Sequence, residues 1–319
     1  MQEVEHSGKK PKSRRSWPGL VLVIGAGLLP VLGEFGRLHW LLDLFSHFQA
    51  QYFIFIALCG LLLFIRGQRR SAIVAAVFLI LPAVRLAPLW IPPAPKGEPD
   101  IRVATFNVLG SNTRYAETLD WIRREQPDVV YLCEPTPAWV EALQPLAELY
   151  PHRVENPKRG NIGFVLFSRF PIRDTRITEH GAVEVPLVAI TVEFPSGPVR
   201  VFGAHPLPPI SGFWAGEHTL YFEALVTGAA ASDTPTLILG DLNATRWGRR
   251  GRELIEAGFE DAAVGRGYRA TWSRSNPLFA IPIDLILSRD LGVCVEFGLG
   301  PDLGSDHRPV IAGFQASSP

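Results

Sequence analysis

Eight polar residues of this 319-residue chain lie at the ends of segments predicted to be strands. They are Asn107, Glu134, His205, Asp241, Asn243, Asp284, Asp306 and His307. Strand ends can converge on one edge of a sheet, so side chains far apart in the sequence can meet there. Taken singly, each residue has a structural explanation as a turn residue, a solvated strand end or a core histidine with its hydrogen bonds satisfied. Taken together, their types form a set that suits chemistry at a phosphate.

The chemistry follows from the donor atoms. Carboxylate and amide oxygens suit a hard cation such as Mg²⁺, and two histidines can stabilise the charge of a phosphorane-like transition state. Asp306 directly precedes His307, and a carboxylate beside an imidazole raises its proton affinity. The three cysteines are far apart and show no zinc-type spacing.

The segments that must position these residues begin near Asp100. Strands are predicted at 101–106, 128–133, 162–167, 185–194, 199–204, 236–239, 283–287 and 309–314, with helices at 115–125, 219–231 and 252–257. A strand-rich α/β sequence of this length fits one layered domain with sheets inside and helices outside.

The polar residues also sit in an ordered series of short motifs. These are Thr-Phe-Asn107-Val, Leu-Cys-Glu134-Pro, Gly-Asp241-Leu-Asn243-Ala, Ile-Asp284-Leu-Ile-Leu and Ser-Asp306-His307-Arg-Pro-Val, with Gly163–Ile172 as a mid-domain strand. In this order they resemble the motifs of the endonuclease/exonuclease/phosphatase family. The resemblance implies a four-layered α/β sandwich, with two packed mixed β-sheets flanked by helices, and Mg²⁺-dependent phosphoester hydrolysis, with Mn²⁺ or Ca²⁺ as substitutes.

The resemblance implies a metal site at Asn107, Glu134 and Asp306, and Asn107 would also contact the substrate. Nuclease-like members often carry a second acidic residue two positions after the first Asn, where this chain has Leu109. A second metal ligand on that loop is therefore in doubt.

The resemblance also implies catalytic roles. Asp241 would position or deprotonate the attacking water, and Asn243 would orient the phosphate. His307, oriented by Asp284, would stabilise the phosphate charge, and His205 would contact a phosphate oxygen. These roles amount to general-base and metal-ion catalysis.

Three apolar runs occupy residues 17–33, about 48–65 and about 71–90, each close to the length of a membrane-spanning helix. They predict a basic N-terminus at 1–16, a three-helix transmembrane region at 17–91, a proline-rich linker at 92–99 and a catalytic domain at 100–319. The first run could instead be a signal peptide, although it lacks a clear cleavage site. Residues 39–48 are predicted to be an interfacial helix, with an early start of the second span as the alternative.

The basic residues set the predicted orientation. Five of them precede the first span, and Arg66, Arg69 and Arg70 lie between the second and third. By the positive-inside rule these segments are cytoplasmic, so three crossings place the domain outside. The expected location is the bacterial inner membrane, as a multi-pass protein with a periplasmic domain.

The charge of the domain bears on its partners. Residues 100–319 hold 20 Lys and Arg against 26 Asp and Glu. Nucleic-acid binding draws much of its affinity from basic residues that neutralise phosphates, so an acidic domain argues against a nucleic-acid partner. No protein partner is predicted, and the membrane itself is the expected partner.

The three spans and outward domain resemble a membrane-bound bacterial branch of the family. That branch includes the teicoplanin-resistance membrane proteins, thought to act on undecaprenyl pyrophosphate. The apolar segment 205–214, which ends in Phe213 and Trp214, looks like that branch and could admit a lipid. Arg246 and Arg249 could bind a pyrophosphate or anionic headgroups.

The predicted substrate is therefore a lipid-linked phosphate, with undecaprenyl pyrophosphate or a phospholipid or sphingolipid headgroup as candidates. Two alternatives remain open. One is an extracytoplasmic metal-dependent nuclease, and the other is a non-catalytic binding module on the same scaffold.

Overall fold

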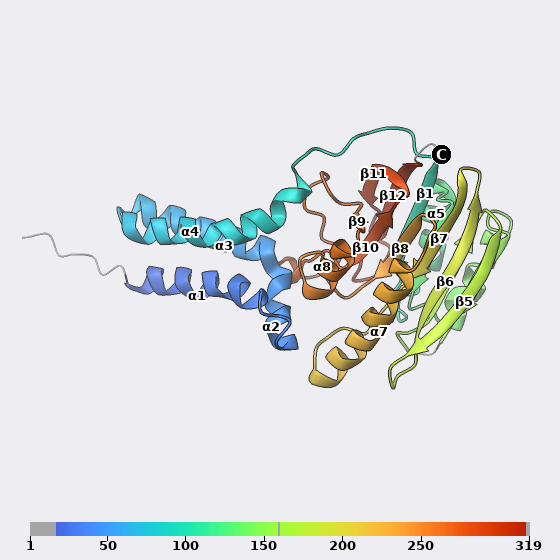
Figure 1. Cartoon of the computed structure of the whole chain (residues 1–319), viewed down its shortest axis with the longest axis horizontal. Coiled ribbons are helices and arrows are strands. Elements are labelled where there is room, and N and C mark those ends of the chain that lie inside the picture. The colour runs from blue at the N-terminus through green and yellow to red at the C-terminus, as the bar shows by residue number, and fades with distance from the viewer. Residues whose placement is uncertain (1–16, 159, 317–319) are drawn as a thin grey trace, which may run out of the picture.

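The computed structural model describes residues 17–158 and 160–316. A helical bundle made of α1 (Trp17–Gly33), α3 (Gln49–Ile65) and α4 (Arg69–Leu86) projects from one side of a body built on two sheets (Figure 1). The short helices α2 (Trp40–Leu44), η1 (Phe45–Phe48) and η2 (Ala87–Leu89) lie where the bundle meets the body. The predicted basic segment 1–16 lies outside the described residues.

Two helical segments are long and apolar enough to cross a membrane. They are Trp40–Ile65, with 26 residues, and Arg69–Leu89, with 21, whereas Pro18–Gly33 is a shorter apolar helix. At 1.5 Å per residue, the 17 residues of α1 extend about 26 Å, against the roughly 30 Å of a bilayer core. Two of the three predicted spans therefore have the required length, and the third crossing stays a prediction.

The predicted interfacial helix at 39–48 is only partly separate. His39 caps α2, since its Nδ1 accepts a hydrogen bond from the backbone N–H of Leu41. From Trp40 onward α2, η1 and α3 follow one another without a break. The structure is thus closer to the alternative reading, in which the second span begins early.

The body consists of two six-stranded sheets packed face to face. The first has the order β11-β12-β1-β2-β4-β3 and the second the order β5-β6-β7-β8-β10-β9. The first sheet comprises β1 (Ile101–Asn107), β2 (Val129–Cys133), β3 (His152–Asn156), β4 (Phe164–Ser168), β11 (Gly292–Leu299) and β12 (Val310–Ala316). The second comprises β5 (Ile172–His180), β6 (Val185–Phe194), β7 (Gly197–Gly203), β8 (Thr236–Asp241), β9 (Glu260–Asp261) and β10 (Asp284–Arg289). The pairs β1–β2 and β7–β8 are parallel and the other pairs antiparallel, so both sheets are mixed.

Three apolar layers hold the body together. Between the sheets, Tyr131 and Leu166 pack against residues such as Leu239. The first sheet is covered outside by α5 (Tyr115–Glu125) and α6 (Pro137–Ala142), and the second by α7 (Gly212–Ala230) and α8 (Arg249–Glu256). The short turns η3 (Gln144–Leu146) and η4 (Pro277–Phe279) complete the described elements. The predicted α/β sandwich of two packed mixed sheets flanked by helices is confirmed.

Four strands were not predicted, namely β3, β5, β9 and β11, and each lies at an edge of its sheet. Edge strands face solvent and carry polar residues, so they lack the apolar runs that reveal central strands. In β5, for example, five consecutive residues from Arg173 to Ile177 are exposed.

Helix α7 begins seven residues before the predicted start at Thr219. Ser211 is its N-cap, because the Ser211 Oγ accepts a hydrogen bond from the backbone N–H of Trp214 at 3.2 Å. Phe213 and Trp214 therefore belong to the first turn of a helix and not to a loop. Similarly, α8 begins at Arg249, three residues before the predicted Arg252.

The linker at 92–99 follows the surface of the body (Figure 1). The Ala94 N–H donates to the Gly265 carbonyl at 3.2 Å, and Arg266 donates to the Pro95 carbonyl at 2.6 Å. Near its end, Gln315 donates to the Glu98 carbonyl at 3.1 Å. These bonds fix the path of the chain between α4 and β1.

We expect Gly240→Ala to destabilise the protein by about 3 kcal/mol or more. The added methyl group would clash with neighbouring backbone, and the backbone conformation of Gly240 is strained for any other residue. Gly240 has φ +148°, and a Cβ there would lie 1.8 Å from the Ala204 carbonyl oxygen. The matched change Gly216→Ala, on an exposed turn of α7 where a Cβ meets nothing within 4 Å, should raise stability by roughly 0.5–1 kcal/mol. Chemical denaturation of the wild-type protein and the two variants in one detergent measures both effects. Equal stabilities of all three would contradict the close packing around Gly240.

Candidate active site

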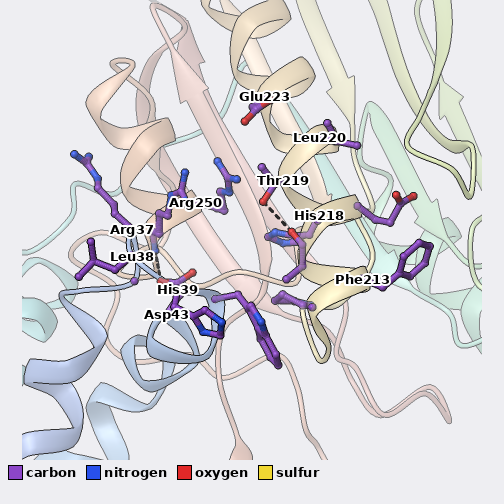
Figure 2. Close-up of a pocket in the computed structure, with 18 residues that line it drawn as sticks. Arg37, Leu38, His39, Asp43, Phe213, His218, Thr219, Leu220, Glu223 and Arg250 are labelled. Atoms are coloured by element: carbon purple, nitrogen blue, oxygen red, sulfur yellow. Dashed lines mark hydrogen bonds between the residues drawn. The ribbon is translucent and has the colours of Figure 1, made fainter.

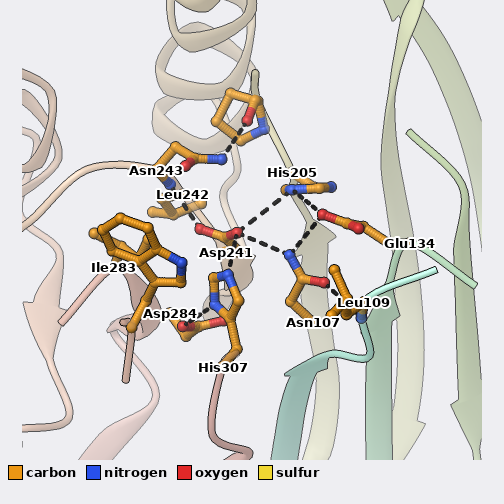
Figure 3. A network of polar contacts seen from close by, with 12 residues as sticks. Asn107, Leu109, Glu134, His205, Asp241, Leu242, Asn243, Ile283, Asp284 and His307 are labelled. Carbon is orange, nitrogen blue, oxygen red and sulfur yellow. Dashed lines mark hydrogen bonds and ion pairs between the residues drawn. The ribbon is translucent and has the colours of Figure 1, made fainter. Parts of the chain in front are cut away.

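Strand pairing brings four of the predicted residues to one end of the sandwich. Asn107 ends β1, and Glu134 follows the parallel strand β2, whose Cys133 pairs with Asn107. In the other sheet, Asp241 ends β8 and Asp284 begins the antiparallel strand β10, and the register pairs these two directly. The two sheets thus contribute carboxylates to a common cluster (Figure 3).

Asn107 connects the two sheets within this cluster. Its Nδ2 donates to Glu134 Oε1 at 2.9 Å and to Asp241 Oδ2 at 3.0 Å. The Nε2 of His205, two residues beyond β7, lies 3.4 Å from Asp241 Oδ2 and 3.7 Å from Glu134 Oε1. Figure 3 shows Glu134, His205 and Asn107 facing Asp241 from one side.

His307 approaches the same oxygen of Asp241, Oδ2, from another direction (Figure 3). Its Nδ1 is 2.8 Å from Asp284 Oδ2, and its Nε2 is 3.6 Å from Asp241 Oδ2. The backbone holds the ring in place, because the His307 N–H donates to Ser305 Oγ at 3.0 Å and that hydroxyl donates to the Asn107 carbonyl at 2.8 Å. The carboxylate of Asp284 thus orients the imidazole toward the centre of the cluster.

The buried charges shift one another's pKa values. Burial alone would raise the pKa of the Asp241 carboxyl, but the imidazoles of His307 and His205 lower it to about 2. Burial alone would lower the pKa of His307, but the carboxylates of Asp284 and Asp241 raise it to about 10. The pKa of His205 is also raised, since Asp241 and Glu134 outweigh its burial. At neutral pH the cluster therefore holds a charged Asp241 between two imidazoles that favour protonation.

Two residues of the site have a left-handed backbone conformation, which is uncommon for residues other than glycine. Glu134 has φ +63° and Asn243 has φ +47°. At Asn243 the turn is supported because its N–H donates to Asp241 Oδ1 at 2.9 Å. Strained positions of this kind cluster at functional sites, where surrounding contacts hold them.

The donor set of the cluster fits a divalent cation. Glu134, Asp241 and Asp284 are all buried, and Asp284 Oδ1 receives no hydrogen bond from the described residues. Ligand atoms of Asp241, Asp284 and His307 lie within 4.8 Å of one another, so this buried group could hold a metal. However, an imidazole must be neutral to bind a metal, and the raised pKa of His307 opposes that. The carboxylate of Glu134 is free of this conflict. Asn107 turns its Nδ2 toward Glu134 and Asp241, and its Oδ1 accepts a hydrogen bond from the Leu109 N–H at 3.1 Å.

The other predicted site residues are placed differently. Asp306 faces the same cavity as the cluster, but its Oδ2 accepts a hydrogen bond from the Trp272 indole at 2.9 Å, and among the described residues no contact joins it to Glu134. Arg246 pairs with Asp261 at 3.7 Å in the interior of the body. The structure therefore does not place Asp306 in contact with Glu134 or Asn107, the other two predicted metal ligands. It also does not place Arg246 in the cavity.

Arg249 and Phe213 lie beside a separate cavity of about 690 Å³ (Figure 2). It opens between the segment Gly36–Asp43 and α7, and Arg249 pairs there with Glu253 at 2.9 Å. Trp214 stacks edge-on against Phe213, with ring centroids 5.2 Å apart. These three predicted substrate contacts are thus grouped together, but away from the carboxylate cluster.

Four members of the cluster, Glu134, His205, Asp241 and His307, line a cavity of about 420 Å³ with largely apolar walls. Asn107 and Asp284 are not among its lining residues. Six of its apolar lining residues are Leu44, Phe48, Leu207, Ile210, Trp272 and Ile281. Leu44, Phe48 and Trp272 were not among the predicted site residues. No signal in the sequence could have found the first two, because they come from the predicted membrane region.

The sequence comparisons identify the family of this body. A model of the Endonuclease/Exonuclease/phosphatase family matches residues 104–307. The chain belongs to this family. The predicted family is therefore confirmed, whereas the membrane-anchored branch within it stays a prediction. Members of the family are metal-dependent phosphoesterases or nucleases.

Solved structures of the endonuclease/exonuclease/phosphatase family share this fold. An endonuclease/exonuclease/phosphatase from Beutenbergia cavernae is 19% identical with a TM-score of 0.56, covering 67% of this chain and 71% of that one. TDP2 of D. rerio with a single-strand DNA product is 20% identical with a TM-score of 0.56, covering 68% and 99%. The 3′ phosphatase NExo from Neisseria, bound to a product DNA hairpin, is 17% identical with a TM-score of 0.56, covering 67% and 99%. At these identities the likeness shows the fold.

A curated relative is also similar to the chain. It is a probable RNA-directed DNA polymerase from transposon X-element of Drosophila melanogaster, 24% identical over 233 residues. The match covers 68% of this chain, which spans only 24% of the length of the relative.

We expect the metal-free protein to lose stability as the pH rises from about 6.5 to about 10. The folded state holds a proton on His307 up to about pH 10, whereas the unfolded chain releases it near 6.5, so folding is favoured below that window and less favoured above it. Denaturation in EDTA at several pH values measures the slope, which His307→Gln should reduce. The control His152→Gln, on β3 outside the cluster, should keep it. Equal slopes in all three proteins would contradict the raised pKa.

Proposed function

We propose that this protein is a membrane-anchored, divalent-metal-dependent phosphoesterase that hydrolyses a lipid-linked phosphate, pyrophosphate or phosphodiester. The observation that carries the proposal is the contrast within one cavity. Its floor is the charged cluster around Asp241, and most of its wall is apolar. A substrate that fits both parts joins an anionic phosphate to a hydrocarbon portion, as undecaprenyl pyrophosphate, a phospholipid or a sphingolipid does.

The residues of the cluster have complementary roles in the proposed hydrolysis. Asp241, charged at neutral pH, accepts a hydrogen bond from the attacking water and orients it or takes its proton. His307, held by Asp284, and His205 face Asp241 and donate hydrogen bonds to phosphate oxygens as negative charge develops there. Asn243 lines the cavity and orients the phosphate.

Glu134 would hold the cation, and Asn107 would join it with its amide group turned so that Oδ1 faces the ion. These oxygens suit Mg²⁺, with Mn²⁺ or Ca²⁺ as substitutes. When bound, a divalent cation neutralises charge on the phosphate oxygens. Asp306 lines the same cavity and would add an acidic group to it, while its Oδ2 accepts a hydrogen bond from the Trp272 indole. Phe213, Trp214 and Arg249 would contact the substrate or headgroups outside this cavity, whereas Arg246, paired with Asp261 in the interior, is not proposed as a contact.

The bundle supports a membrane location. Large apolar side chains such as Ile54, Leu58 and Val84 face outward from α3 and α4, more than half exposed. Soluble proteins rarely expose contiguous apolar faces of this size. Gly60 lies against Ala75, so that α3 and α4 approach closely, as helices in membranes do.

We further propose that α1, α3 and α4 all cross the membrane. The loop with Arg66 and Arg69 would then face the cytoplasm, and the catalytic body the periplasm of a bacterial inner membrane. Tilt and local thinning of the bilayer accommodate the shorter α1. The Arg85 side chain pairs with Glu34 at the body end of the bundle, which reduces the cost of a charge at that depth.

A nuclease is the second candidate function, because TDP2 and NExo carry DNA in their solved structures. Two features of this chain favour a lipid substrate instead. The domain has more acidic than basic residues, and neither Lys nor Arg lines the 420 Å³ cavity among the described residues. Nucleic-acid binding requires basic residues along the phosphate backbone.

We expect the full-length protein to release phosphate or headgroup from at least one lipid in detergent micelles with Mg²⁺. The panel comprises phospholipids, sphingolipids and polyprenyl pyrophosphates. EDTA should abolish the release, and Asp241→Asn should lower kcat on the order of a thousandfold, because it removes the charge that orients the water. The control Asp233→Asn, in the turn before β8, should leave kcat unchanged.

Other outcomes of that panel would favour the alternatives. Nicking of plasmid DNA without lipid turnover would support the nuclease. Intact folding and Mg²⁺ binding without turnover of any phosphoester would support a binding module.

We expect a tag at the C-terminus to be cleaved by protease added to intact spheroplasts, and a tag at the N-terminus to be protected. Three crossings with a cytoplasmic N-terminus require this pattern. Western blots of both tags, with lysed spheroplasts as the control, measure it. Protection of the C-terminal tag in intact cells would overturn the proposed orientation.

A further inference from the structure

The segment Leu44–Phe48, which we call the elbow, joins α2 to α3 and reaches the catalytic cavity. Leu44, His47 and Phe48 line the same cavity as Asp241 and His307. The elbow precedes Asp241 by nearly two hundred residues and belongs to a helical segment long and apolar enough to cross a membrane. A wall of the candidate active site is therefore built by the bundle and not by the family fold.

The elbow is fixed to the loop that follows β8. Trp247 Nε1 donates to the His47 carbonyl at 3.0 Å, and His47 Nδ1 lies 2.9 Å from Thr245 Oγ1. One turn earlier in the chain, Asp43 Oδ1 accepts a hydrogen bond from the Arg249 backbone at 2.8 Å. Because this loop directly follows Asp241, the elbow and the cluster are held in one arrangement before any substrate binds.

The elbow also shares an apolar rim with two other segments. Phe48 packs edge-on against Phe279 of η4, with ring centroids 6.0 Å apart. Leu278, next to Phe279 in the chain and not a lining residue of the cavity, is 75% exposed, and Ile210, which lines the cavity, is 69% exposed. Exposed apolar side chains at a cavity mouth mark a site for an apolar partner. Here they lie next to helices of membrane length.

We propose that the elbow seats the hydrocarbon chain of the substrate, with Phe48 and Leu44 on one side of the chain and Ile210 on the other. The phosphate then lies against the cluster while the chain leaves toward the lipid surface along the bundle. This inference rests on the proposed function and adds to it the residues that select lipid-linked phosphoesters. Burial of the chain adds binding energy that a water-soluble phosphoester with the same reacting group lacks.

The test compares long and short substrates that share one reacting group. The first pair is geranylgeranyl and isopentenyl pyrophosphate, and the second is long-chain and dihexanoyl phosphatidic acid. For the pair that the wild-type protein hydrolyses, Phe48→Ala should lower the ratio of kcat/KM for the long substrate to that for the short one by about tenfold, because a buried phenyl contact is lost. Ile210→Ser should lower the same ratio, because it removes the apolar contact proposed on the other side of the hydrocarbon chain.

A matched control is Phe55→Ala, which removes a phenylalanine from the outward face of α3 and should leave both rates unchanged. Ile210 is largely exposed, so its variant keeps the test valid if Phe48→Ala fails to fold. If wild-type protein prefers the long substrate but neither Phe48→Ala nor Ile210→Ser changes the ratio, the elbow proposal is overturned and the proposed function stands. If wild-type protein hydrolyses no lipid phosphate, both fall together.

Discussion

Three carboxylates, those of Glu134, Asp241 and Asp284, are buried together where the two sheets meet. Burying even one uncompensated carboxylate is costly, so the cluster requires positive partners in fixed places. The imidazoles of His205 and His307 are such partners, and each comes from a different part of the chain. Separating these charges from their partners would cost free energy, so the ion pairs hold the ends of the two sheets together. A divalent cation would compensate the remaining negative charge.

The apolar walls strengthen this electrostatic arrangement. Interactions between charges weaken in water, and a cavity lined by side chains such as Trp272 and Ile281 limits the water around the cluster. The bundle contributes to the same wall through the elbow, and an ion pair between Glu34 and Arg252 links the two parts again at 3.4 Å. Charge at the floor and hydrocarbon at the wall are thus complementary features of one site, which is why a substrate with both characters suits it.

The central strands and the polar residues at their ends could be predicted from the sequence, because buried strands are continuous apolar runs and each motif is local. The edge strands could not, since their exposed residues carry no such pattern. Contacts between segments far apart in the sequence could not be predicted either, because the apolar pattern describes only one segment at a time. Asp306 adjoins His307 in sequence, yet its carboxylate turns to Trp272, and Arg246 turns inward to Asp261. Neighbours in sequence need not point the same way in a turn.

The sequence by itself determined the family, the order of the strand-end motifs and the apolar character of the N-terminal third, because each of these is written in short, contiguous stretches. Only the tertiary structure decided which side chains share the cavity. Phe48 lies beside a cluster whose members begin at Asn107 and end at His307, and the hydrogen bonds of His47 to Thr245 and Trp247 hold it there. Such contacts depend on how the bundle docks on the body, which is a property of packing and not of any local pattern.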